Sequence, residues 1–144
     1  AAAGGRKVEL EELMRESDYI SINVSLLPTT RNLIGVKEIA LMKPSAFLVN
    51  CSRGGIVDEA PLVEALKSKK IAGAGLDTFA HEPLSPNDPL CQLDNVILTP
   101  HAAWYTVDAM RELQSMTAKQ VALVLTGQEP TRCVNYEEAK KNRK

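Results

Sequence analysis

The sequence has no excess of basic side chains and no long apolar run, and each absence removes a class of protein. Lys and Arg number 17 against 18 for Asp and Glu, so the formal net charge is −1 and no basic footprint for nucleic acid is present. No stretch approaches the roughly 18–20 consecutive apolar residues of a membrane-spanning helix. No basic start precedes an apolar signal core. We therefore expect neither a nucleic-acid nor a membrane partner.

Cysteine is also scarce, with Cys51, Cys91 and Cys133 spread along the chain and no Cys-x-x-Cys pair. An odd number at such spacing fits neither a zinc or redox site nor a paired disulfide framework. We therefore expect no metal site and a reducing, cytoplasmic location. With 144 residues, 44% of them hydrophobic, the chain can bury a core as one domain. We expect residues 1–5 to be a flexible leader and residues 136–144 a polar tail.

Short apolar runs alternate with helical patterns between these ends. Four runs, apolar on both faces, predict strands: DYISINVSL from Asp18, AFLVN at 46–50, GAGLDTF at 73–79 and NVILTP at 95–100. Helices are predicted over 10–15, within 30–43, after a cap at Asp58, and from Thr106 to Gly127. Strands of this kind separated by helices are typical of a parallel sheet, so we predict the α/β class.

Polar side chains gather where three of the predicted strands end. Arg53 follows the second strand, Asp77 the third with Glu82 in the loop beyond it, and His101 the fourth. Open α/β sheets bind ligands beyond the carboxyl ends of their strands. Taken singly, each residue has a structural alternative. Arg53 and Glu82 could be solvated surface charges, Asp77 could cap a turn, and His101 could be a buried structural histidine. All four alternatives would have to hold at one edge of the sheet, which favours a site.

The chemistry of these four side chains narrows the class of substrate that they could bind. An imidazole beside a carboxylate is suited to general acid–base work. A guanidinium offers a planar fork for a substrate carboxylate. The set therefore favours a carboxylate-bearing carbonyl or alcohol. We expect His81 to be exposed and outside the site, and nothing near Cys51 supplies a base that would activate its thiol.

Three segments, LVNCSRGGIVDEAPLVEAL, AGAGLDTFAHEPL and NVILTPHAAW, closely resemble the signatures of the D-2-hydroxyacid dehydrogenases. The resemblance runs from about Val8 to Asn135. It implies an oxidoreductase that transfers a hydride between NAD(P)H and C2 of a small 2-keto or 2-hydroxy acid. It also implies that Arg53 holds the substrate carboxylate and keto oxygen, that His101 exchanges a proton with that oxygen, and that Glu82 pairs with His101.

The same resemblance implies NAD as the cofactor, with NADP left open. Asp77 would face the nicotinamide carboxamide or ribose, and the segment NVSLLPTTRNLI (23–34) would lie over the adenosine half. The residues that the resemblance places at the cofactor are Ser25, Leu26, Thr30, Cys51, Ser52, Arg53, Asp77, His101 and Ala103. Residues 23–27 depart from the family's usual histidine–x–proline–leucine–threonine pattern, but backbone groups supply much of that contact.

The ending PHAAWYT, with TGQEP and CVN beyond it, is most like the branch that holds the C-terminal-binding-protein corepressors and their bacterial dehydrogenase relatives. In that branch a tryptophan lines the substrate pocket, which here implies Trp104; a plain core aromatic is the alternative. A corepressor-like NAD(H) sensor that binds protein partners is therefore the main alternative to an enzyme. A catalytically inactive interaction module is the third hypothesis.

The family's G-x-G-x-x-G turn and the acidic residue that follows it are missing from these 144 residues. We therefore expect the second half of a doubly wound, Rossmann-like dinucleotide-binding fold without its first βαβ unit, cut from a parent roughly twice as long or more. The isolated chain should be inactive and bind NADH weakly. Its first strand, within residues 18–25, should leave a bare edge through which a homodimer or aggregate forms.

Overall fold

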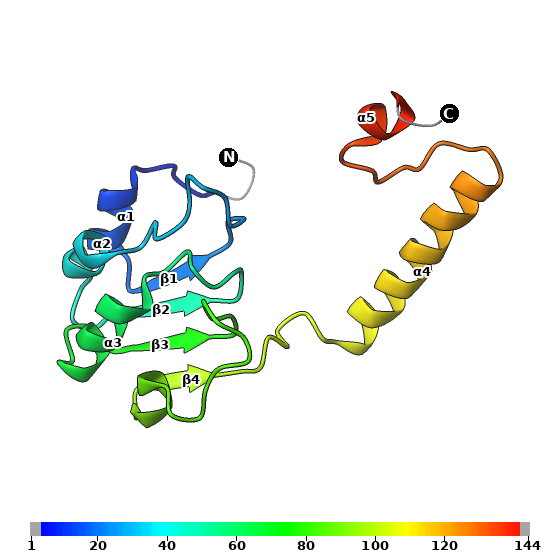
Figure 1. Ribbon diagram of the computed structural model, residues 1–144. Helices are drawn as coiled ribbons and strands as arrows, with labels where there is room; N and C mark the ends of the chain where they lie inside the picture. Colours follow the sequence, from blue (N-terminus) through cyan, green and yellow to red (C-terminus); the bar gives the residue numbers. More distant parts are fainter. Residues whose placement is uncertain (1–3, 142–144) are drawn as a thin grey trace. The chain divides into compact units, whose positions relative to one another are not determined.

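The computed structural model describes residues 4–141 and contains one sheet of four parallel strands (Figure 1). The strands are β1 (Tyr19–Ile22), β2 (Phe47–Asn50), β3 (Gly73–Leu76) and β4 (Val96–Leu98), in the spatial order β1-β2-β3-β4. Each predicted apolar run holds one of these strands, so the predicted α/β class is confirmed. Because all neighbours pair in parallel, the four carboxyl ends meet at one edge of the sheet.

The helices predicted over 10–15, within 30–43, after Asp58 and from Thr106 are present, and the structure adds two that were not predicted, one between β3 and β4 and one in the expected tail. They are α1 (Leu10–Glu16), α2 (Val36–Leu41), α3 (Glu59–Lys67), the short 3₁₀ helix η1 (Pro89–Gln92), α4 (Val107–Leu125) and α5 (Tyr136–Lys141). The predicted cap is confirmed, since the Asp58 side chain accepts from the Ala60 amide, and at the predicted helix start the Thr106 hydroxyl likewise accepts from the Ala109 amide. These bonds satisfy amide groups that the first turn of a helix leaves unpaired.

The core lies on one face of the sheet. Alternate strand residues such as Ile20, Leu48 and Leu76 are buried there against helix residues such as Met14 and Leu62. The opposite face carries the exposed side chains Tyr19, Phe47 and Ile97. The sequence predicted strands buried on both faces. Within residues 4–103 only one face is covered, because the apolar faces of α1, α2 and α3 all join the same core.

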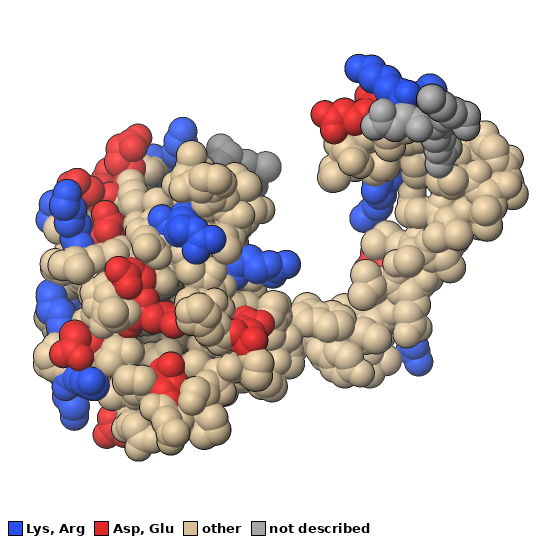
Figure 2. Space-filling model, in the orientation of Figure 1, with Lys and Arg blue, Asp and Glu red and all other residues tan. Residues whose placement is uncertain are grey.

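The chain divides into two compact units, Ala1–Ala103 and Trp104–Lys144. The first holds the whole sheet, and on the face drawn in Figure 2 its acidic and basic side chains are interspersed. In the second, α4 buries none of its residues, and the Gln120 side chain accepts hydrogen bonds from the amides of Thr131 and Arg132. No helix within residues 4–141 is long and apolar enough to cross a membrane.

Both predicted ends extend past the described residues. Residues 1–3 of the expected leader and residues 142–144 of the expected tail lie outside the described part of the chain. The rest of that tail forms the short helix α5, which buries no residue.

Candidate functional site

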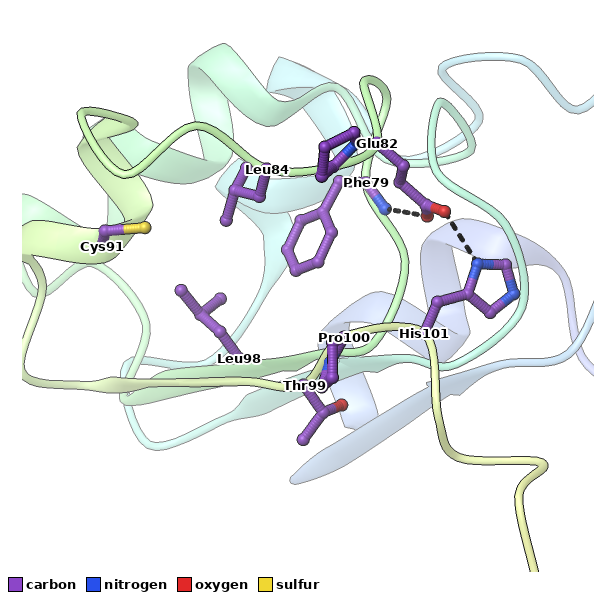
Figure 3. A pocket seen from close by; sticks show the side chains of 9 residues that line it. Phe79, Glu82, Leu84, Cys91, Leu98, Thr99, Pro100 and His101 are labelled. Atoms are coloured by element: carbon purple, nitrogen blue, oxygen red, sulfur yellow. Dashed lines mark hydrogen bonds and ion pairs between the residues drawn. The ribbon is translucent and has the colours of Figure 1, made fainter.

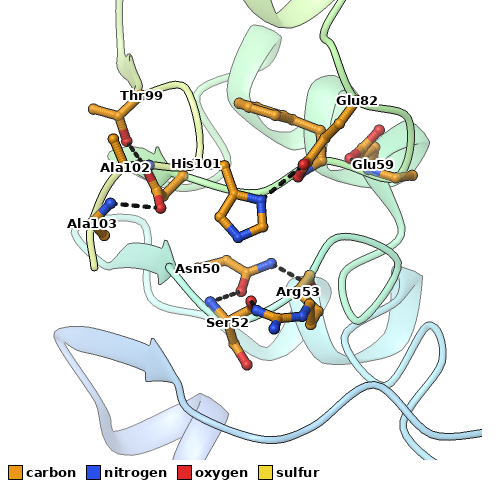
Figure 4. Close-up of polar contacts among 12 residues, drawn as sticks. Asn50, Ser52, Arg53, Glu59, Glu82, Thr99, His101, Ala102 and Ala103 are labelled. Carbon is orange, nitrogen blue, oxygen red and sulfur yellow. Dashed lines mark hydrogen bonds and ion pairs between the residues drawn. The ribbon is translucent and has the colours of Figure 1, made fainter. Parts of the chain in front are cut away.

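The carboxyl edge of the sheet brings together three loops that carry ionisable side chains. Arg53 follows β2, Asp77 comes directly after β3, and His101 lies beyond the end of β4 (Figure 4). Because the strands are neighbours and parallel, loops that lie 24 or more residues apart in sequence meet in space. The sequence prediction that these residue types share one edge therefore agrees with the geometry.

His101 and Glu82 form a direct pair. The imidazole Nδ1 lies 2.8 Å from Glu82 Oε2, and Glu82 Oε1 accepts a 3.0 Å hydrogen bond from the Phe79 amide. The hydrogen bond from His101 and the one from Phe79 together hold the pKa of Glu82 below its ordinary value of 4.5. Glu82 is therefore ionised at neutral pH. An ionised carboxylate only accepts, so His101 Nδ1 is the donor and Nε2 is the ring atom turned away from Glu82.

Asp77 is buried, with 2% of its surface exposed, and its carboxylate accepts three hydrogen bonds from the segment that carries His101. Oδ1 accepts from the Thr99 hydroxyl and from the Ala102 amide at 2.8 Å, while Oδ2 accepts from the Ala103 amide at 3.0 Å. Burial raises the pKa of Asp77, but the bonds from Thr99, Ala103 and Ala102 outweigh it and hold the pKa below its ordinary value of 3.8. Asp77 is therefore a buried, ionised group.

The Arg53 loop is organised by Asn50, the last residue of β2. Its side-chain nitrogen donates to the Arg53 carbonyl at 3.0 Å, and its side-chain oxygen accepts from the Ser52 amide at 3.1 Å. The Arg53 guanidinium donates to the Ser52 carbonyl at 2.7 Å. Within residues 4–141 no carboxylate lies at ion-pair distance from Arg53. Its charge is therefore available to an anionic group from outside the chain.

A cavity of about 530 Å³ opens at the carboxyl ends of β1 and β2. Its lining residues are Asn23, Val24, Ser25, Leu26, Ser52 and Arg53. The Ser52 hydroxyl donates to the Val24 carbonyl, which joins the two loops that form the walls. Four of the residues that the sequence assigned to the cofactor, Ser25, Leu26, Ser52 and Arg53, therefore lie around one cavity.

The other residues predicted to meet the cofactor lie around this cavity or near the His101 segment. The Thr30 hydroxyl donates to the Ser25 carbonyl at 2.6 Å and accepts from the Leu27 amide at 2.7 Å, so it stabilises the turn that forms one cavity wall. Cys51 is exposed beside Ser52 and is not part of a disulfide. The amide of Ala103 is held by the buried aspartate described above.

Trp104 begins the second unit and packs edge-on against Tyr105, with ring centroids 5.3 Å apart. That Trp104 lines a substrate pocket stays a prediction.

A second cavity, of about 620 Å³, lies on the Glu82 side of the histidine (Figure 3). The side chains of Phe79, Leu84 and Leu98 form part of the apolar wall of this cavity, and the Glu82–His101 pair lies at the margin of the cavity. Apolar surroundings on this side strengthen the electrostatic interaction of the pair, because they keep part of it out of water.

Sequence reasoning missed three residues that shape this edge: Asn50, Gly54 and Glu59. Glu59 Oε1 accepts a 2.6 Å hydrogen bond from the Ala80 amide and so ties the start of α3 to the loop that carries Glu82. A Cβ added at Gly54 would overlap the Phe79 carbonyl, so only glycine lets the Arg53 loop pack on the Glu82 loop. The available signals were a polar residue that ends an apolar strand and the Gly-Gly pair after the arginine.

Comparisons with known proteins identify the family of the chain. The family model for the NAD binding domain of D-isomer specific 2-hydroxyacid dehydrogenase matches residues 1–103. The chain is 43% identical over 137 residues to the glyoxylate reductase of Korarchaeum cryptofilum, covering 95% of this chain and 41% of that protein. It is 46% identical over 127 residues to the D-3-phosphoglycerate dehydrogenase of Methanocaldococcus jannaschii, covering 88% and 24%.

A solved structure shares the fold as well. The D-isomer specific 2-hydroxyacid dehydrogenase of Lactobacillus delbrueckii ssp. bulgaricus, in its NAD complexed form, superposes with a TM-score of 0.80 at 36% identity. The match covers 88% of this chain and 43% of that one. The chain thus spans about two fifths of the length of the glyoxylate reductase and of this solved structure.

Proposed function

The chain belongs to the D-isomer specific 2-hydroxyacid dehydrogenase family, as part of its NAD-binding domain, and from this premise we propose what the whole protein does. It transfers a hydride between NAD(P)H and a small 2-keto or 2-hydroxy acid such as glyoxylate, hydroxypyruvate or pyruvate. The observation that carries the proposal is the 2.8 Å contact between His101 Nδ1 and Glu82 Oε2, at the same sheet edge as the Arg53 guanidinium. Both side chains of the pair are about one-third exposed, so a small substrate can reach them.

The roles of the three side chains follow from their chemistry. Arg53 binds the substrate carboxylate and keto oxygen through its planar donor fork. His101 Nε2 donates a proton to the keto oxygen during reduction and accepts it back during oxidation. Glu82 accepts from Nδ1, which orients the ring and stabilises the imidazolium. The nicotinamide cofactor, when bound, supplies the hydride that reduces C2.

The residues present fit part of such a cofactor. Ser25, Leu26, Ser52 and Arg53 line the cavity at the carboxyl ends of β1 and β2, where doubly wound sheets bind dinucleotides. Cys51, Ala103 and the turn stabilised by Thr30 complete that side of the proposed cofactor site. The G-x-G-x-x-G turn that binds a pyrophosphate is not among the 144 residues. We therefore expect Ser25, Leu26 and the Thr30 turn to lie against the adenosine half of the cofactor, and all of these residues to contribute little to phosphate binding.

The corepressor-like alternative is less well supported. The named relatives are a glyoxylate reductase and a phosphoglycerate dehydrogenase, and the identity to each is above 40%. The test is loss of NADH absorbance when the whole protein is offered glyoxylate, hydroxypyruvate and pyruvate in turn. Turnover of one of them supports the proposal. Tight NADH binding with no turnover of any of them would favour the sensor instead.

Arg53→Lys should raise KM for the keto acid about tenfold while leaving Kd for NADH within about twofold. Lysine keeps the positive charge but loses the planar fork that can hold the carboxylate and the keto oxygen together. Steady-state kinetics of the whole protein measure this split. The matched control is Arg15→Lys, since Arg15 lies in the last turn of α1 and pairs on the surface with Glu11, away from the carboxyl edge. Equal effects of the two substitutions would contradict the assignment of Arg53 to the substrate site.

We also propose that copies of the chain associate through β1. Within residues 4–141, β1 pairs with a strand on one side only, so its other side presents unpaired backbone groups. Sedimentation velocity of the 144-residue chain should show a concentration-dependent dimer or larger species. Ser21→Lys, on the exposed face of β1, should weaken it, because an edge lysine discourages strand pairing. A monodisperse monomer at all concentrations would contradict this.

A cytoplasmic location is the remaining part of the proposal. The support is that Cys51, Cys91 and Cys133 are all free and exposed, as is usual for proteins of reducing compartments.

A further inference from the structure

In the described part of the chain, the buried polar residues lie at or just beyond the ends of two strands. Among residues 4–141 the buried polar or charged residues are Asn50, Asp77 and Thr78. Asn50 ends β2, and Asp77 directly follows β3. A buried carboxylate is costly unless several donors satisfy it. The positions of the donors that bond to Asp77 therefore indicate the structural role of this buried carboxylate.

The three hydrogen bonds of Asp77 bracket His101 in sequence. One donor, the Thr99 hydroxyl, lies two residues before the histidine. The other two, the amides of Ala102 and Ala103, follow it directly. His101 itself has a φ of 55°, a left-handed backbone conformation that is uncommon for any residue but glycine. Such a conformation persists only where its surroundings hold it.

We propose that Asp77 is a positioning residue that fixes the backbone on both sides of His101 and thereby places the imidazole against Glu82. The proposal rests on the proposed function, since it assigns a purpose to the placement of the proton donor. It differs from the role that the family resemblance implies, in which Asp77 faces the nicotinamide. Holding His101 in its left-handed conformation directs its Cβ, and with it the ring, toward the loop that carries Glu82.

A carboxylate suits this task better than an amide. Its two oxygens offer about four acceptor positions, and three donors use them here. In Asp77→Asn one oxygen becomes an NH₂ group, which cannot accept from a backbone amide. At least one of the bonds to Thr99, Ala102 or Ala103 is then lost, and its donor is left without this acceptor. The substitution changes little in volume, so its effect reports on hydrogen bonding.

The three hydrogen bonds from Thr99, Ala102 and Ala103 to Asp77 form a clamp around His101. Amide hydrogen exchange of the 144-residue chain tests this clamp without cofactor or turnover. In Asp77→Asn, exchange at Ala102 and Ala103 should speed up at least about tenfold relative to the Ala74 amide, which bonds to the Asn95 carbonyl in the sheet. The matched control is Asp88→Asn, because Asp88 accepts from the Leu90 amide in a different loop. It should leave Ala102 unchanged. Equal acceleration of all three amides in Asp77→Asn, or no acceleration, would overturn the proposal.

Kinetics of the whole protein then separate positioning from cofactor binding. Asp77→Asn should lower kcat for keto-acid reduction at least about tenfold with Kd for NADH within about threefold. Thr99→Val, which removes one donor and keeps the carboxylate, should shift kcat in the same direction by less, and it provides the test if Asp77→Asn does not fold. A raised Kd for NADH with unchanged kcat would assign Asp77 to the cofactor and overturn the proposal. A wild-type protein that reduces no 2-keto acid would refute the proposed function, whereas the exchange data would still decide whether the clamp exists.

Discussion

His101→Ala should lower kcat for keto-acid reduction by the whole protein at least about 100-fold, because general acid catalysis by a positioned side chain contributes about 10²- to 10⁴-fold. The imidazole is held by Glu82 through Nδ1, so Nε2 is the atom that can meet the keto oxygen. Alanine removes the proton donor and leaves Arg53 to bind the substrate carboxylate. KM for the keto acid and Kd for NADH should therefore change far less than kcat. Stopped-flow measurement of a single turnover checks that the chemical step is the one affected.

The chain offers its own control for this experiment. His81 is the other histidine, and it is exposed in the loop that also carries Glu82. His81→Ala removes the same group from the same neighbourhood without touching the pair, and it should keep kcat within about twofold. A loss of similar size in both variants would mean that the loop, and not the imidazole of His101, limits turnover.

The fold was largely predictable because its strongest signals are local. The four apolar runs contain the four strands, and the caps at Asp58 and Thr106 begin the helices that the sequence predicted. Strand ends were harder to place, since apolar residues such as Val24 lie just past the end of β1 in the cavity wall. Apolar character alone does not distinguish a strand from the loop that packs beside it.

The sequence predicted that Arg53, Asp77 and His101 lie at one edge of the sheet, but not the hydrogen bonds among the loops that carry them. Parallel strand ends bring Arg53, Asp77 and His101 to one edge, and this follows from the order of motifs along the chain. The hydrogen bonds of Asp77 reach across 22–26 residues to a segment beyond the next strand. No local pattern encodes such a bond, because it depends on how two loops meet after the sheet has formed. The same reason hides the contact between Glu59 and the Ala80 amide.

The packing of two loops at Gly54 leads to the second large effect. Gly54→Ala should destabilise the 144-residue chain by about 3 kcal/mol, at the upper end of the usual cost of overpacking. A Cβ at this position would overlap the carbonyl group of Phe79 and crowd the Ala80 amide, and backbone atoms cannot swing aside as a side chain can. Because Gly54 follows Arg53 directly, the strain must move the loop that holds the guanidinium. We expect kcat/KM of the whole protein to fall about 100-fold, as misplacement by about 1 Å can cost that much.

Gly75→Ala separates this local overlap from a general cost of adding a methyl group. Gly75 lies in β3, and a Cβ there would meet Val49 at 3.8–3.9 Å, an ordinary van der Waals distance. Urea unfolding of the chain should therefore show at most about 1 kcal/mol of change for Gly75→Ala. If the two variants unfold alike, the close approach at Gly54 is not what sets the spacing between the Arg53 and Glu82 loops. If only Gly54→Ala is destabilised and slow, the distance between the Arg53 guanidinium and the His101–Glu82 pair is fixed by backbone packing.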